Sequence, residues 1–366
     1  MNSHNYKQPW ISKPFVELWF IIMPPFLCLL IIAVFPLLFQ NNSYMPEAGW
    51  VIMILLVDVA HVYSTLYRTY FDATALKKQR SLLTIIPFAA FVIGAVLYSI
   101  SSLWFWRILA YVAVYHFIRQ QYGFMRIYSR KEQYGKAFKL IDKLTIYYAT
   151  LYPIAYWHLK PNRNFNWFVQ GDFFSFQSAW LLNMLTVFYL CVVAVFFIKE
   201  MVSFLRHKYI NFPKLAVISG TLVSWYFGIV YFNGDMAFTL LNVVSHGIPY
   251  MALIWLYGNK QTNKPATGKT FLKTVFSSYG IIIFLSIVFL FAFIEESLWD
   301  AMVWNEHGKI FRLPDMHLSP AFLSIIVPLL AVPQITHYVI DGFIWRIKNE
   351  DIKWSNEIAA TKNAAG

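Results

Sequence analysis

Long apolar runs, separated by short connections rich in lysine and arginine, make up most of the 366-residue chain. A helix needs about 20 apolar residues to cross the hydrocarbon core of a bilayer, and ten runs come close to that length. This pattern predicts an all-α fold, a polytopic transmembrane helical bundle of about ten spans. The predicted spans are 15–39, 49–70, 82–102, 103–128, 141–157, 177–201, 213–232, 236–257, 272–294 and 318–345.

No soluble domain, Gly/Ser-rich linker or internal repeat interrupts these runs. The sequence therefore predicts a single transmembrane domain, residues 15–345, between an N-terminal tail of residues 1–14 and a C-terminal tail of residues 346–366. The first apolar run lacks a small-residue cleavage site after a short apolar core, so we interpret it as a retained span. The short run 141–157 could be a re-entrant segment in place of a full span.

Lysine and arginine follow the positive-inside pattern. Of the 30 Lys and Arg residues, 24 lie in the two tails and in the connections after the second, fourth, sixth and eighth spans, against four in the other connections. This asymmetry predicts that both termini are cytoplasmic. It also explains the net charge of +12 through topology and contact with anionic lipids at the cytoplasmic face, so nucleic acid is not a predicted partner.

Composition narrows the class of protein further. Hydrophobic residues make up 58% of the chain and charged residues 13%, about half the charge of a soluble domain, which excludes a soluble enzyme. The two cysteines, Cys28 and Cys191, lie in apolar runs, so neither a disulfide framework nor a Cys-based zinc site is expected. We predict a multi-pass integral protein of a bacterial inner membrane, and the apolar pattern favours no particular oligomeric state.

Four histidines lie within predicted spans, where ionisable side chains are costly and often functional. They stand in spans that run in the same direction, and they precede the first cationic residue on the inner side by 7, 10, 14 and 9 positions. At about 1.5 Å per residue, these depths agree within roughly 10 Å. We therefore expect the four side chains to converge on one layer as ligands of a shared metal ion. They are His61, His116, His246 and His337.

Polar residues accompany these histidines at helical spacing. Asp58 lies three positions before the histidine of its span, and Asp341 lies four positions after the histidine of its span. Either carboxylate could accept the imidazole N–H that is not used on a metal, or could itself be a ligand. Arg119 also follows a histidine by three positions. We predict Asp58, Arg119 and Asp341 as candidate catalytic residues, and structural roles for Gln120 and Asn242.

The ligand set indicates which metals would bind. Neutral imidazoles with few carboxylates suit iron(II), copper or zinc better than magnesium or calcium. Iron(II), the favoured ion, would indicate oxygen activation on a hydrophobic small molecule or lipid that enters from the bilayer, whereas zinc would indicate hydrolysis. Haem with histidine axial ligands is a further alternative. The HExxH, P-loop, GxSxG and Rossmann patterns are absent.

This layout resembles a known family. A multi-pass membrane protein with four separate intramembrane histidines is similar to the Brp/Blh-like bacterial beta-carotene dioxygenases, and two fragments add to the likeness: Ser-His-Gly at 245–247, and HxxxD from His337 to Asp341. The resemblance implies a membrane oxygenase in which four histidines hold a non-haem iron that cleaves a carotenoid to retinal. By this resemblance, the iron ligands would be His61, His116, His246 and His337.

Two other classes of protein remain open. In a proton-coupled transporter, a proton relay could be formed by the histidines with Asp58, Asp235, Asp341 and Arg119. Helices broken near Gly247 and Pro249, or at Pro24 and Pro25, would suit a midplane binding site. In a structural or assembly factor, the histidines would be replaceable. These alternatives differ from the metalloenzyme in whether the purified protein carries a metal ion.

The two longest outer connections contain many aromatic residues. Residues 158–176 and 295–317 are predicted to form either interfacial amphipathic segments that act as lids or parts of an aromatic belt at the bilayer surface.

Overall fold

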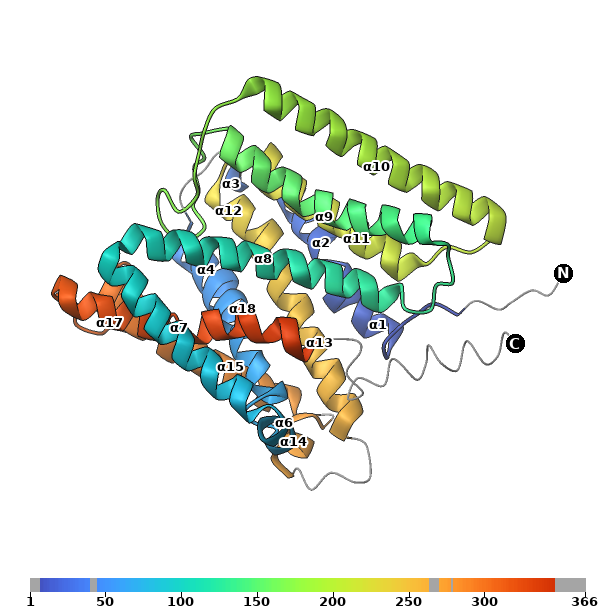
Figure 1. Ribbon diagram of the computed structural model, residues 1–366. Coiled ribbons are helices and arrows are strands. Elements are labelled where there is room, and N and C mark those ends of the chain that lie inside the picture. The colour runs from blue at the N-terminus through green and yellow to red at the C-terminus, as the bar shows by residue number, and fades with distance from the viewer. Residues whose placement is uncertain (1–6, 40–44, 263–269, 278, 346–366) are drawn as a thin grey trace.

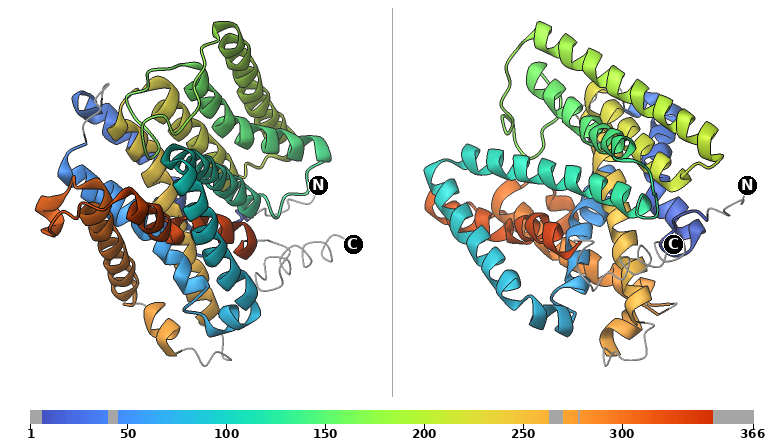
Figure 2. Two further views of the ribbon diagram at one scale, coloured as in Figure 1. Left: turned by 60° about the vertical axis from the view of Figure 1, so that its left-hand side comes forward. Right: turned by 45° about the vertical axis from the view of Figure 1, so that its right-hand side comes forward.

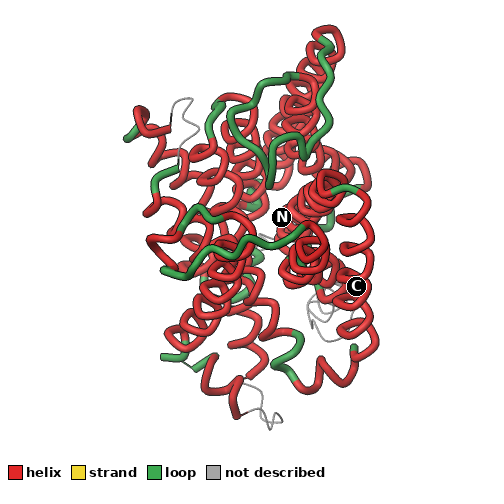
Figure 3. The backbone as a smooth tube through the Cα atoms, turned by 90° about the vertical axis from the view of Figure 1, so that its left-hand side faces the viewer, coloured by secondary structure: helices red, strands yellow, loops and turns green. Residues whose placement is uncertain are grey.

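The computed structural model describes residues 7–39, 45–262, 270–277 and 279–345. All regular structure in these ranges is helical, and no strand occurs in them. The predicted all-α fold is therefore confirmed. Figure 1 shows the helices as one bundle, and the tube in Figure 3 shows the loops that join them.

The first half of the described chain contains long helices as well as short helical turns. Segments η1 and η2 have the wider π-helical hydrogen bonding, and η3 is a 3₁₀ turn. The bounds are α1 Pro14–Glu17, η1 Leu18–Ile22, α2 Pro24–Val34, α3 Pro36–Phe39, α4 Glu47–Trp50, η2 Val51–Val59, α5 Ala60–Ser64, η3 Thr65–Arg68, α6 Ala73–Lys78, α7 Arg80–Ile100, α8 Ser102–Tyr128 and α9 Lys136–Leu159.

The second half also contains both long helices and short helical turns, and its segments η4, η5 and η6 are π-helical. The bounds are α10 Ala179–His207, α11 Phe212–Trp225, η4 Tyr226–Tyr231, α12 Asp235–Phe238, η5 Thr239–Val244, α13 Ser245–Thr262, α14 Thr270–Val275, α15 Ile281–Trp299, η6 Asp300–Trp304, α16 Gly308–Phe311, α17 Pro320–Leu330 and α18 Val332–Ile344.

Seven helical stretches in the described ranges are long and apolar enough to cross a membrane. An eighth is present if the pair Pro14–Ile22 and Pro24–Val34, bent by 54°, counts as one broken span. The remaining two predicted spans, 103–128 and 141–157, lie on α8 and α9, which are long helices but less apolar than the other seven. The chain thus has the helices of a membrane protein.

Several element boundaries differ from the sequence prediction. Helix α9 has 24 residues and includes Pro153, so the predicted short span 141–157 is part of a longer helix. Helix α15 continues through Glu295 to Trp299 and then into η6, so the predicted outer connection 295–317 begins with ten helical residues. The last predicted span is divided into α17 and α18 at Ala331, because Pro333 cannot continue the backbone ladder of α17.

Helices α8, α13 and α18 lie in the middle of the bundle (Figures 1 and 2), and α5 packs against α13 and α18 there. Helix α18 packs on α7, α8 and α5, and α13 packs on α5, η2 and η5. Helix α10 lies at the periphery along α9, and only 11% of its most apolar stretch is buried. The centre of the bundle is therefore built from segments that lie far apart in the sequence.

The N-terminal segment and two connections, all predicted on the cytoplasmic side, lie together at one end of the bundle. The Gln8 side chain donates to the carbonyl of Ile210 over 2.8 Å. The Asn211 side chain donates to the carbonyl of Tyr128, also over 2.8 Å, and the Arg130 guanidinium donates to the carbonyl of Pro9 over 2.6 Å. The N-terminal segment, the α8–α9 turn and the α10–α11 turn thus share one face.

Candidate metal centre

The four intramembrane histidines lie around one point. Each offers a ring nitrogen such that these four atoms all lie within 4.8 Å of one another. Neighbouring ring centroids are 4.5 to 5.0 Å apart, and each side chain is at most 3% exposed. The predicted convergence on one layer is confirmed. The four residues that could hold a metal ion are His61 on α5, His116 on α8, His246 on α13 and His337 on α18.

Most nitrogen atoms of this cluster are buried without a hydrogen-bond partner. Both ring nitrogens of His61 and of His246 lack a partner, as do the Nε2 atoms of His116 and His337. A buried, unpaired polar atom costs about 1–3 kcal/mol, so six such atoms together are an unusual burden for a folded protein. A cation at the centre would satisfy four of them at once, since neutral imidazole binds a metal through its free nitrogen.

A hydrogen-bond network fixes the ring of His337. Its Nδ1 atom lies 2.7 Å from Thr65 Oγ1, which lies 2.9 Å from the hydroxyl of Tyr250. That hydroxyl donates to Asp341 Oδ1 over 2.5 Å. Because Nδ1 is engaged by Thr65, the Nε2 atom is left to face the centre.

The two predicted carboxylates lie beside the cluster. The Asp341 carboxylate lies between two rings, 3.8 Å from His337 Nδ1 and 3.9 Å from His116 Nδ1. Asp58 Oδ1 lies 3.6 Å from His61 Nδ1. These separations exceed a normal hydrogen bond, so the acids stand next to the rings without binding them directly. Asp341 is 9% exposed and Asp58 is 34% exposed, while the ring of His61 between Asp58 and the centre is 1% exposed.

Stacking and main-chain contacts position His246. The ring of Phe117 lies parallel to it, with centroids 3.6 Å apart and planes at 5°. The Gln120 side chain donates to the His246 carbonyl over 2.9 Å, in keeping with its predicted structural role. At Gly247, a Cβ atom would lie 2.8 Å from Val57 Cγ1 and 3.0 Å from the Val57 carbonyl oxygen. Only glycine permits this close approach, which brings α13 against η2 beside the cluster.

Two of the histidines directly follow π-helical segments. Segment η2 ends at Val59, two residues before His61, and η5 ends at Val244, two residues before His246. The two segments pack against each other. The predicted break in α13 near Gly247 and Pro249 is therefore a change of helical type just before the histidine, with α13 itself continuous through Pro249. Such wide turns are frequent at functional sites.

Arg119, predicted as a catalytic residue, has its side chain away from the histidine cluster. Its side chain is exposed and donates to the hydroxyl of Tyr147 over 2.8 Å. The guanidinium also lies 5.1 Å from the centre of the Tyr122 ring. The spacing of three residues from His116 was the same as that of Asp58 from His61, but on α8 it directs the side chain toward α9.

Sequence reasoning overlooked Thr65, Tyr250 and Phe117. Thr65 and Tyr250 each follow a cluster histidine by four positions, the same helical spacing that identified Asp341. That signal was available in the sequence for both residues. Glu295 was also overlooked, because it was assigned to a loop; it is buried on α15 and accepts a 2.5 Å hydrogen bond from the Tyr63 hydroxyl.

The connection after α9, which the sequence predicts on the outer side, packs onto the aromatic residues next to the site. Phe165 and Phe173 are buried, and the ring of Trp167 lies 5.1 Å from that of Phe117, which stacks on His246. Burial raises the pKa of Asp172, while the backbone amides of Phe168 and Val169, which donate to its carboxylate, act in the opposite direction. The connection is thus folded inward.

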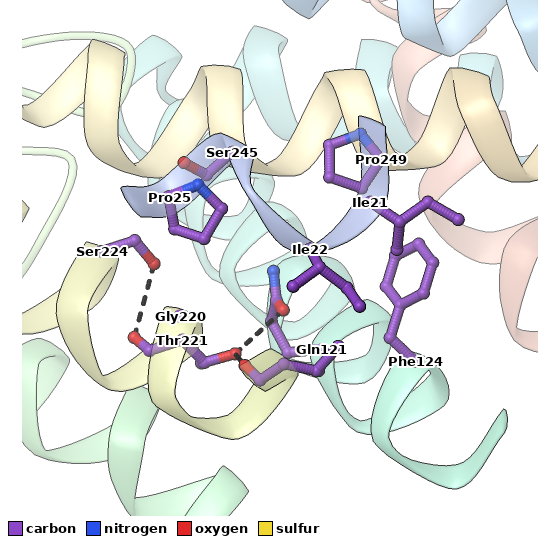
Figure 4. A pocket seen from close by; sticks show the side chains of 11 residues that line it. Ile21, Ile22, Pro25, Gln121, Phe124, Gly220, Thr221, Ser224, Ser245 and Pro249 are labelled. Atoms are coloured by element: carbon purple, nitrogen blue, oxygen red, sulfur yellow. Dashed lines mark hydrogen bonds between the residues drawn. The ribbon is translucent and has the colours of Figure 1, made fainter. Parts of the chain in front are cut away.

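A small cavity lies beside the cluster at Ser245, the residue before His246. Figure 4 shows that Ser245 and Pro249 line it from one side and Gly220, Thr221 and Ser224 from another. Its volume is about 20 Å³, which is enough for about one water molecule. A substrate of the predicted size does not fit there.

The network around His337 gives a first testable prediction. Replacing Thr65 by valine, Thr65→Val, removes the partner of Nδ1, and we expect metal affinity to fall about 10- to 100-fold with little change in fold. Thr150→Val on α9, another fully buried threonine, is the matched control. Competition with a chelator of known affinity measures the difference, and equal affinity of the two variants would refute the positioning role.

Comparisons with protein-family models, with curated proteins and with solved structures find no match for this chain.

Proposed function

We propose that this protein is an integral membrane metalloenzyme that uses an iron(II) ion, held by four intramembrane histidines, for oxidative chemistry on a hydrophobic substrate. The six buried imidazole nitrogens without a partner carry the proposal. All four ligands are nitrogen donors, a set that suits iron, copper or zinc. Bound iron(II) with an open coordination position would supply oxygen activation.

The surrounding residues support this chemistry by orienting and enclosing the site. Thr65 and Asp341 lie beside the outer nitrogens of the rings, which sets the direction of the inner nitrogens. Phe117 shields one face of His246 and keeps it apolar. Asp58, which is partly exposed, lies beside the Nδ1 atom of His61.

The proposal includes the topology and the substrate class. Ten spans with both termini cytoplasmic would place the cluster inside the bilayer of a bacterial inner membrane, within reach of lipid or terpenoid molecules. The resemblance to the Brp/Blh-like beta-carotene dioxygenases supports a carotenoid-like substrate and is carried by His337, Asp341 and the segment 245–247.

Metal analysis tests the enzyme directly. We expect protein purified in detergent without chelators to contain about one transition-metal ion per chain, measured by inductively coupled plasma mass spectrometry. Iron would support oxidative chemistry, and zinc would point to hydrolysis instead. A folded, metal-free protein that also fails to take up added iron(II) would contradict the proposal and favour a transporter or an assembly factor.

The substrate is tested separately in a host that accumulates beta-carotene. We expect expression of the wild-type protein to bleach the cells and produce retinal, and expression of His337→Ala to leave the pigment unchanged. Bleaching without retinal would indicate another cleavage position. An unbleached host with iron-loaded protein would exclude beta-carotene and leave the metal site intact.

A further inference from the structure

The turn between α8 and α9 borders a cavity of about 260 Å³ that has no part in the metal centre. Four cationic and two acidic side chains line it. Arg126 comes from the last turn of α8, and three lysines come from the first two turns of α9: Lys136, Lys139 and Lys143. This density of positive charge indicates an anionic ligand.

The two acids that also line the cavity form ion pairs with lysines outside its lining. Glu132 forms an ion pair of 2.9 Å with Lys214. Asp142 pairs with the same lysine over 3.2 Å and also with Lys199. Within the described part of the chain, no ion pair connects these acids, or any other, to the four cations of the cavity. Glu200 shares the same two lysines, so three carboxylates face two ammonium groups there. Arg126 and the three lysines therefore leave a net positive charge at the cavity, reduced by one excess carboxylate.

The beginning of α9 adds a further attraction for an anion. This helix has 24 residues and starts at Lys136, and its N-cap residue Gly135 provides no side chain to accept from the first-turn amides. The unpaired amides and the helix dipole both favour a negative group at this end. Phosphate groups commonly bind in this position.

The cavity also borders an apolar surface. Leu140 and Leu144, which alternate with Lys139 and Lys143 on α9, are 53% and 43% exposed. In a membrane protein such leucines contact acyl chains, while the neighbouring lysines extend to the headgroups. A ligand at this position would thus have both a phosphate for the cations and a tail for the leucines.

We propose that the cavity between α8 and α9 binds the phosphate of an anionic phospholipid headgroup through Arg126, Lys136, Lys139 and Lys143. The ligand chemistry is a phosphate-bearing anion. A lipid is the expected source because of the adjacent apolar surface, and free phosphate is the alternative source. A zwitterionic headgroup binds less well, since its ammonium group meets four cations.

Native mass spectrometry of the full-length protein in detergent tests the site. The probes are phosphatidylglycerol, phosphatidylcholine and inorganic phosphate. We expect phosphatidylglycerol to bind the wild type and to bind about tenfold more weakly to the double variant Lys139→Gln, Lys143→Gln. The matched control is Lys77→Gln with Arg80→Gln, which removes two cations from another predicted cytoplasmic connection, and it should bind as the wild type does.

Each outcome decides between the alternatives. Equal loss of binding in both double variants, or no loss of either phosphatidylglycerol or inorganic phosphate in both, would overturn the site and leave only a general attraction of the basic face. Binding of phosphatidylcholine as tightly as phosphatidylglycerol would overturn the requirement for net negative charge. If inorganic phosphate binds only where Lys139 and Lys143 are present, and phosphatidylglycerol does not depend on them, the source is free phosphate and the lipid is excluded. Metal content should be the same in all variants, so this test is independent of the metal centre.

Discussion

His116→Ala and His337→Ala should each lose the bound metal ion, with a fall in affinity of more than about 100-fold. Each substitution removes one of four ligand atoms that lie within 4.8 Å of one another. Binding free energy at such a site adds to the free energy of folding, because the unfolded chain has no preformed site. We therefore expect a chelator to lower the melting temperature of the wild type and to change that of the two variants little.

The control for this prediction is a histidine outside the cluster. His207 lies in the last turn of α10, is exposed and contacts Tyr134. His207→Ala should keep the metal and the response to the chelator. The prediction fails if His337→Ala retains metal at the wild-type level, or if the chelator shifts the melting temperatures of the wild type and His337→Ala equally.

Gly247→Ala should weaken both the fold and metal binding although it adds a single methyl group. The new Cβ atom would lie 2.8 Å from Val57 Cγ1 and 3.0 Å from the carbonyl oxygen of Val57, and a backbone atom cannot move aside as a flexible side chain can. Helix α13 must then shift away from η2 and carry His246 with it. Overpacking of this kind costs about 1–3 kcal/mol. Thermal unfolding and metal content of the same preparation measure the two effects.

Gly123→Ala is the matched control, because a Cβ atom at this position on α8 would have no neighbour within 4 Å. Alanine favours a helix over glycine by about 1 kcal/mol, so this variant should be as stable as the wild type or more stable. If Gly247→Ala behaves in the same way and keeps its metal, the close approach of α13 and η2 is not needed for the site.

The histidine cluster could be predicted from the sequence because the positions that indicate it can be read along the chain without the fold. An ionisable residue inside an apolar run is conspicuous without any knowledge of the fold, and depth along a helix follows from its rise per residue. His61 and His337 were identified in this way, and so was Asp341 through its spacing of four residues. Arg119 shows the limit of this reasoning, since a spacing of three residues placed Asp58 beside its histidine and Arg119 away from it.

Helix boundaries were less predictable, because a charged residue inside a helix can be buried with partners that lie elsewhere in the fold. The predicted span 272–294 ended where charged residues began, but α15 continues because Glu295 is buried and accepts from Tyr63 and Trp299. A carboxylate that accepts hydrogen bonds from neighbouring side chains can be buried without water. A hydropathy value depends only on residue type, so it cannot predict such partners.

The sequence by itself determined that this chain is a helical membrane protein, and that four histidines lie at similar depth, because apolar length and ionisable residues can be read along one dimension. Only the tertiary structure decided which nitrogen atoms face the centre. That choice depends on contacts such as the one between Thr65 and His337, which are 272 positions apart in the sequence. It also depends on the rotation of each helix about its axis, which is set by packing at points such as Gly247 on Val57.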